Sequence, residues 1–168
     1  MNLGLILWIA GAGVVLTALL VSGLRVVHEH ERGVVFRTGR LRRVCAPGLR
    51  WLLPLGIDRL QRVDVRILTM RVDSHDAITS DQVLARVIAD VYFQVVNPQL
   101  AVTKVADFRE ATAHVAETQL RSVIGKVGLT DLLSTRELLS PAVTKVIDDE
   151  TEPWGVRITN VDLKEVLL

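Results

Sequence analysis

The sequence predicts an α+β protein: an N-terminal transmembrane helix followed by a small domain with a mainly antiparallel sheet and packed helices. Three observations support this prediction. Residues 3–24 form an uncharged apolar run, and residues 58–96 contain two stretches of alternating apolar and polar side chains, which are typical of half-buried strands. Residues 97–147 change to the three-four spacing of amphipathic helices, before alternation returns at residues 156–163.

Residues 1–24 are predicted to be a membrane anchor. No charged residue or histidine precedes Arg25, and the 22 residues from 3 to 24 would form a helix of ~33 Å, against a hydrocarbon core of ~30 Å. A cleaved signal peptide would carry a basic segment that Met1 and Asn2 do not supply, and a buried core helix rarely runs so far without polar residues. The side chains that we expect in the bilayer include Leu3, Leu5, Ile6, Trp8, Val14, Leu16, Leu20 and Leu24.

The segment after the anchor is rich in arginine. Residues 25–50 contain seven arginines and two acidic residues, so the positive-inside rule places the domain in the cytoplasm and the short N-terminus outside the cell membrane. Residues 51–53 are apolar and lie between two prolines, which favours a shallow second contact with the bilayer, although burial in the domain core is an open alternative. The residues expected at the membrane surface are Arg25, Arg32, Arg42, Arg43, Arg50, Trp51, Leu52 and Leu53.

Several strands are expected in the domain. A short strand is predicted at residues 33–39, and residues 40–54 contain turn-forming residues at 46–48 and then the apolar residues 51–53 before Pro54. Two longer strands at residues 58–72 and 82–96, joined by a polar turn at residues 75–81, are expected to pair antiparallel. The second strand should bury Val83, Ala85, Val87, Ala89, Val91, Phe93 and Val95 on one face.

Two helices follow these strands. Asn97 is expected to cap the first helix, with Pro98 at its first position. Asp107 and Glu110 resemble a capping box that opens the second helix. The stripe expected to face the core from the second helix is Ala113, Ala116, Leu120, Val123 and Val127.

A third helix is predicted before residue 148. Ser134 and Glu137 could cap it, but Pro141 then lies deep in the helix, which requires either a kink or a start at Ser140. Its apolar stripe is Leu138, Leu139, Ala142, Val143, Val146 and Ile147.

The residues give no sign of a catalytic, metal or cofactor site. An aromatic content of 4% and nearly balanced charges argue against nucleic-acid binding. His28 and His30 would share a strand face, but no third metal ligand is evident. The Ser, His and Asp residues of the turn at residues 75–81 lie on one turn, whereas a catalytic triad is built from separate parts of a fold. Cys45, the single cysteine, excludes an internal disulfide and leaves acylation or a buried thiol open.

Residues 27–40, VHEHERGVVFRTGR, resemble the opening of stomatin-like (slipin) proteins, in which a membrane segment leads into this motif. The similarity covers nearly all of residues 25–168 in the same order, which is more specific than any one motif. It continues through residues 47–49, 53–54, 57–59, 63–66, 78–81, 97–98, 118–121, 132–137 and 154–156.

This resemblance implies an SPFH (band 7) domain at residues 25–168 and a non-enzymatic, membrane-bound oligomeric scaffold that organises membrane microdomains without a cofactor. The implied partners are the lipid bilayer, further copies of the chain and, as for similar bacterial and archaeal proteins, a membrane serine protease. The family continues into a helical coiled-coil region, which we expect to be missing after Leu168. The anchor has no proline, which favours a straight spanning helix.

Two other classes of function are compatible with the same residues. A membrane-bound enzyme would need a catalytic constellation that the sequence does not reveal. A membrane-tethered adaptor would regulate a partner protease or channel without self-assembly.

Overall fold

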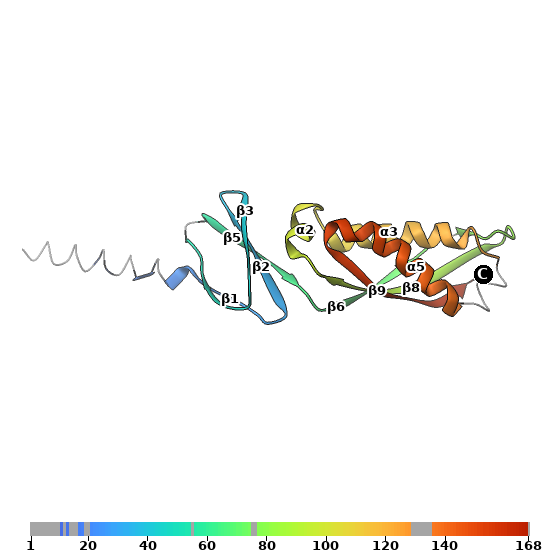
Figure 1. Ribbon diagram of the computed structural model, residues 1–168, viewed down its shortest axis with the longest axis horizontal. Helices are drawn as coiled ribbons and strands as arrows, with labels where there is room; N and C mark the ends of the chain where they lie inside the picture. Colours follow the sequence, from blue (N-terminus) through green and yellow to red (C-terminus); the bar gives the residue numbers. More distant parts are fainter. Residues whose placement is uncertain are drawn as a thin grey trace, which may run out of the picture. The chain divides into compact units, whose positions relative to one another are not determined.

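The computed structural model of the chain describes residues 11, 13, 17, 18, 21–54, 56–74, 77–128 and 136–167 (Figure 1). The chain consists of two compact units, Met1–Asp64 and Val65–Leu168. The sequence analysis treated all of the chain after the anchor as one domain. Both units contain antiparallel strands, and the second adds helices, so the α+β prediction is confirmed for the described residues.

Of the predicted anchor, only residues 11, 13, 17, 18 and 21–24 are described. No helix within the described part of the chain is long and apolar enough to cross a membrane. Leu24, predicted as the last residue of the anchor, instead begins a β-strand. The anchor residues that lie outside the described part are Leu3, Leu5, Ile6, Trp8, Val14, Leu16 and Leu20.

The first unit contains a two-stranded ribbon and a three-stranded sheet, both antiparallel. In the sheet, the central strand pairs with a neighbour on each side in the order β3-β2-β5. Within residues 24–51 the sequence predicted a strand only at residues 33–39 and missed the other three strands of this segment, whereas the last strand of the unit belongs to the strand predicted at residues 58–72. The ribbon consists of β1 (Leu24–Val27) and β4 (Gly48–Trp51), and the sheet of β2 (Glu31–Arg37), β3 (Arg40–Cys45) and β5 (Asp58–Asp64).

The second unit is built around one long strand, β8 (Leu84–Val95), which pairs antiparallel with three other strands. Two long helices lie over the sheet that these strands form (Figure 1). The elements that complete this unit are β6 (Ile67–Asp73), β7 (Ala77–Ile78), α2 (Pro98–Thr103), α3 (Phe108–Ile124), α5 (Arg136–Thr151), the short 3₁₀ helix η1 (Glu152–Trp154) and β9 (Val156–Leu167).

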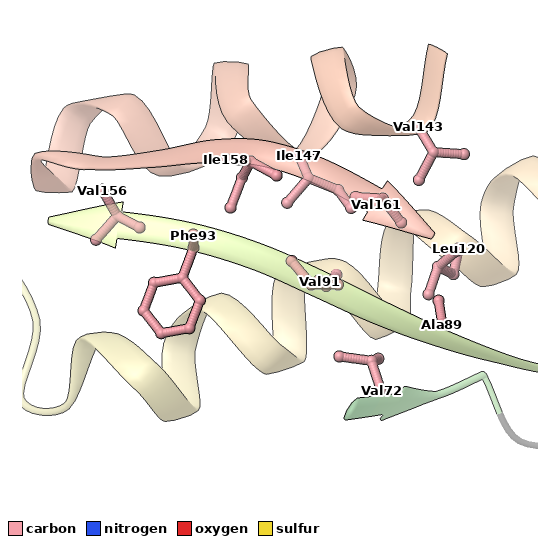
Figure 2. Packing of buried hydrophobic residues seen from close by; sticks show 11 residues of the cluster. Val72, Ala89, Val91, Phe93, Leu120, Val143, Ile147, Val156, Ile158 and Val161 are labelled. Carbon is pink, nitrogen blue, oxygen red and sulfur yellow. The ribbon is translucent and has the colours of Figure 1, made fainter. Parts of the chain in front are cut away.

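The predicted alternation is confirmed from Ala85 onward, whereas Val83, predicted on the same buried face, is only half-buried and precedes β8. Every second residue from Ala85 to Val95 is at most 1% exposed, because this face of the strand packs beneath α3 and α5. Figure 2 shows Phe93 and Val91 of β8 among apolar residues of β9, α5 and α3. The main core cluster comprises Val72, Ala89, Val91, Phe93, Ala116, Leu120, Val143, Ile147, Val156, Ile158 and Val161.

The predicted helix starts are confirmed at two positions. The Asn97 side chain accepts hydrogen bonds from the backbone N–H groups of Gln99 and Leu100, and Pro98 opens α2. The Asp107 side chain likewise accepts from Arg109 and Glu110 at the start of α3. Such bonds satisfy N–H groups that have no partner within the helix.

The predicted stripe of the second helix is confirmed at Ala116 and Leu120, and Val123 and Val127 pack against the core, but the buried side of α3 differs at its start. Thr112, Ala116, Leu120 and Ile124, each four residues apart, are buried, whereas Ala113 is partly exposed. Thr112 is accommodated because its hydroxyl donates to the carbonyl of Phe108 at 2.6 Å.

The third helix, α5, begins at Arg136 and contains Pro141, so the alternative start at Ser140 is wrong. The Ser140 hydroxyl instead donates to the carbonyl of Val161, which ties α5 to β9. Leu138 belongs to this helix, but its side chain is outside the described set, as is Ser134.

The strand predicted at residues 58–72 is two strands in different units. β5 ends at Asp64 and β6 begins at Ile67, with Val65 and Arg66 between them. Val63 is 3% exposed, whereas Ile67 is 55% exposed, although the sequence pattern placed both on one buried face. A one-residue change of phase moves every later side chain to the opposite face.

Candidate membrane-contact surface

An apolar surface lies on one face of the ribbon formed by β1 and β4. Leu24 pairs with Trp51 and Val26 with Leu49, so these four side chains point to the same side. Their exposed fractions are 44%, 46%, 52% and 65%, respectively. We call these four residues the ribbon surface.

The opposite face of the ribbon region is closed by the core of the first unit. Val27 of β1 is 2% exposed, and Leu52, directly after β4, packs with Val35 and Cys45. A Cβ atom at Gly33 would lie 2.7 Å from Cδ1 of Leu60 and 3.3 Å from Cγ2 of Val27, so a larger residue here would require the Leu60 side chain to move. The ribbon is therefore held with its other apolar face outward.

The end of the N-terminal apolar run is joined directly to this ribbon. The carbonyl of Gly23 accepts a hydrogen bond of 2.8 Å from the N–H of Leu52, just beyond the ladder between β1 and β4. A Cβ atom at Gly23 would lie 2.4 Å from the carbonyl oxygen of Leu52, so no larger residue fits without a backbone shift. The ribbon surface thus starts where the predicted anchor ends.

A profile described as "SPFH domain / Band 7 family" matches residues 25–168 of the chain. The chain belongs to this family. A stomatin homologue of Pyrococcus horikoshii is 42% identical over 149 residues, which are 89% of this chain and 56% of the relative. The stomatin-like resemblance is therefore confirmed.

Other relatives show the same partial coverage. An uncharacterised protein of Archaeoglobus fulgidus is 44% identical over 161 residues, 96% of this chain and 64% of its own length. Stomatin-like protein 3 of Mus musculus is 37% identical over 145 residues, 85% of this chain and 50% of its own. The SPFH chain described here spans between 50 and 64% of the lengths of these three relatives.

The structure separates the three apolar residues predicted at the membrane surface. Trp51 belongs to the ribbon surface, whereas Leu52 is 5% exposed and lies in the core of the first unit. Leu53 is half-buried. Leu52 is therefore not available at the surface, because adjacent residues at the end of a strand point to opposite sides. Sequence reasoning missed Val26 and Leu49, which alternation around Arg25 and Arg50 could have revealed.

The predicted surface arginines occupy several positions in the first unit. Arg25 and Arg50 pair across the ribbon on the face opposite to the ribbon surface. Arg42 and Arg43 are exposed on β3, and Arg32 is half-buried and donates to the carbonyls of Glu29 and Glu31.

Charge is distributed unequally between the two units of this SPFH chain. Residues 1–64 contain nine arginines, no lysine and four acidic residues, a net charge of +5. Residues 65–168 contain eleven basic and fifteen acidic residues, a net charge of −4. The net charge of the whole chain is only +1, so this asymmetry does not show in the total. The excess of positive charge lies in the unit that carries the ribbon.

One buried ion pair fixes the connection between the ribbon and the sheet. Nε and Nη2 of Arg37 donate to the two carboxylate oxygens of Asp58 at 2.7 and 2.8 Å, and the N–H of Leu53 donates to Oδ2 at 3.1 Å. The Asp58 side chain is 2% exposed. The hydrogen bonds from Arg37, opposed by burial, lower the pKa of Asp58 to about 2.

The other candidate groups do not form a site in the described residues. His28 and His30 lie in the turn before β2 rather than on a strand, and Nδ1 of His28 is 3.2 Å from Oε2 of Glu31. Within the described ranges, no group of three or more His, Cys, Asp or Glu residues could hold a metal ion. Cys45 is buried in the first unit's core, and His75 and Asp76 are outside the described residues.

Replacing Asp58 with asparagine is expected to destabilise the first unit and reduce its acid sensitivity. Because the folded-state pKa of about 2 lies below the ordinary 3.8, this carboxylate stabilises the fold above pH 3.8, and the stabilisation is lost as the pH falls through 2. We expect the free energy of unfolding at pH 7 to fall by about 1–3 kcal/mol. Amide hydrogen exchange of β2 and β5 measures this, with exposed Glu29→Gln as the control. Unchanged exchange in Asp58→Asn would contradict the assignment.

Proposed function

We propose that this SPFH chain is the membrane-proximal part of a membrane-anchored oligomeric scaffold that organises membrane microdomains and associated proteins. The observation that carries the proposal is the ribbon surface, four exposed apolar side chains that follow directly on a long apolar run. Membership of the SPFH family and similarity to stomatin homologues support it. The proposed role requires no catalytic group and no cofactor.

The occupant that we propose for the ribbon surface is the headgroup boundary of the same bilayer that holds residues 1–24. Continuity supports this choice, because Gly23 is hydrogen-bonded to Leu52 and leaves little chain between an anchor and the ribbon. The mixture of one tryptophan with branched aliphatic side chains suits an interface, where an indole ring can contact both headgroups and acyl chains. The net charge of +5 in the same unit favours a surface of anionic lipids.

The scaffold role includes self-association of the whole protein. The chain spans only 50–64% of the relatives compared above, so further helical sequence, as the family resemblance implies, would supply contacts between copies. Confinement to a bilayer would raise the effective concentration without adding a contact. A membrane serine protease is the associated protein that the same resemblance implies. The alternative is a tethered adaptor that regulates a protease or channel as a monomer.

The ribbon surface can be tested by removing its apolar side chains. In residues 21–168, the double substitution Leu49→Ser and Trp51→Ser should weaken binding to vesicles by at least about tenfold, because apolar area no longer enters the interface. Vesicle cosedimentation measures the binding. The matched control is Ile78→Ser with Leu84→Ser, an exposed cross-strand apolar pair of the second unit. Equal binding of both variants would exclude the ribbon as the contact.

The proposed orientation is a cytoplasmic domain with the N-terminus outside, which rests on the arginines after residue 24. A cysteine introduced at Asn2, in a variant with Cys45→Ala, should react with a membrane-impermeant thiol reagent in intact cells. A cysteine at Asp162, which is exposed, should react only after lysis. Labelling of position 162 in intact cells would reverse the topology.

Self-assembly decides between the scaffold and the adaptor. Residues 25–168 alone should be monomeric or weakly associating, because their sequence provides no heptad seam for association between copies. The unabridged protein, with its anchor and any helical extension, should form large homo-oligomers in mild detergent. Light scattering measures both masses, and a monodisperse monomer from the unabridged protein would favour the adaptor.

A further inference from the structure

A groove in the first unit lies beside the point where the apolar run enters the ribbon. Its volume is about 480 Å³, within the ~300–1,000 Å³ of typical small-ligand sites. Ser22 and Gly23 line one part of it, and residues of the segment after β4 and of strand β5 line the rest. The groove is thus formed entirely within the first unit, next to the predicted anchor.

Two arginines supply positive charge to this groove. Arg25 of β1 and Arg62 of β5 both line it. Among the described residues, no carboxylate lies within ion-pair distance of Arg25, and Arg62 has only a distant contact of 4.0 Å with Glu31. Both guanidinium groups therefore retain donors for a ligand. The guanidinium fork matches phosphate oxygens better than a lysine ammonium does.

The remaining lining explains why a simple anion is not the best match. Leu53 and Leu60, both half-buried, provide apolar surface beside the arginines, and the nearly buried Leu52 lies behind them. Asp58, which also lines the groove, is paired with Arg37 through two hydrogen bonds, so its negative charge is compensated. The groove therefore offers a cationic end and an apolar wall, the combination presented by the headgroup and first methylene groups of an anionic phospholipid.

We propose that this groove binds the phosphate of one anionic phospholipid, with Arg25 and Arg62 on the phosphate and the leucine wall against the start of an acyl chain. The inference rests on the proposed membrane function and adds a specific lipid site to it. It assigns the two arginines a role that the ribbon surface does not share, because Arg25 points to the opposite side of β1 from Leu24 and Val26. A lipid held here would be adjacent to the anchor that it accompanies.

The test uses the full chain in a maltoside detergent, which contains no phosphate. Calorimetric titration compares dihexanoyl phosphatidylglycerol, dihexanoyl phosphatidylcholine and inorganic phosphate. We expect the phosphatidylglycerol to bind most tightly. The double substitution Arg25→Gln and Arg62→Gln should weaken this binding by about tenfold or more, because two charge-assisted contacts are lost.

A matched control removes two exposed arginines of the same unit outside the groove. Arg40→Gln with Arg59→Gln changes the net charge equally, and the affinity should stay within about twofold of the unsubstituted chain. If the groove variant fails to fold, Arg25→Lys provides a second test, because it keeps the charge but loses the planar fork. It should weaken phosphatidylglycerol binding by more than the twofold allowed for the control variant, and an unchanged affinity would overturn the role of Arg25.

Each outcome bears on one claim. Equal loss in the groove and control variants would reduce the effect to net charge and overturn the site. Inorganic phosphate that binds as tightly as phosphatidylglycerol would show a free-phosphate site and overturn the lipid assignment. The proposed membrane contact is tested separately, by binding to vesicles of neutral phosphatidylcholine. That binding should depend on Leu49 and Trp51, and the variant with both groove arginines replaced should bind these vesicles as tightly as the unsubstituted chain.

Discussion

Each sheet of this protein has an apolar face that must be covered, and the two units meet this requirement in different ways. In the second unit, α3 and α5 cover the face that carries Val91 and Phe93 of β8. In the first unit, the ribbon and the segment after β4 supply the cover through Val27 and Leu52, which are buried beside β2. A two-stranded ribbon used as a cover has a second face of its own. In this unit that face is apolar and exposed, which is the physical origin of the candidate membrane contact.

The Arg37–Asp58 pair explains how the ribbon and the groove can keep a defined geometry. Asp58 receives hydrogen bonds from β2 and from the segment after β4, so one carboxylate connects the sheet to the chain leaving the ribbon. Separating this buried carboxylate from its partners would cost more free energy than the intact pair adds to the net stability of the fold. The pair therefore opposes any change in geometry that would leave Asp58 unpaired. Because the charge of Asp58 is compensated locally, Arg25 and Arg62 are the remaining charged residues that line the groove.

Sequence patterns predicted the second unit much better than the first. Asn97 and Asp107 cap helices through neighbouring residues, and β8 alternates over twelve residues, so local information was sufficient. The ribbon depends on pairing of residues 24–27 with residues 48–51, which no local pattern specifies. Leu24 was assigned to the apolar run for that reason, and the break at Val65 was hidden because polar and apolar residues continue to alternate through it. Alternation and helical spacing predict the α+β class, and the family resemblance adds the SPFH domain, but neither predicts the exposure of Val26 and Leu49.

The ribbon surface is modest in size, and the proposed anchored state explains why this can suffice. A protein that binds a bilayer from solution must offset the loss of translational freedom with the contact itself, whereas an anchored domain has already lost most of that freedom. Four partly exposed side chains would then be enough to hold the anchored domain against the bilayer. The arginines of the same unit act over a longer range that salt shortens, and the apolar contact acts only at close approach. Attraction to anionic headgroups would thus orient the unit, and burial of Trp51 and its neighbours would fix it there.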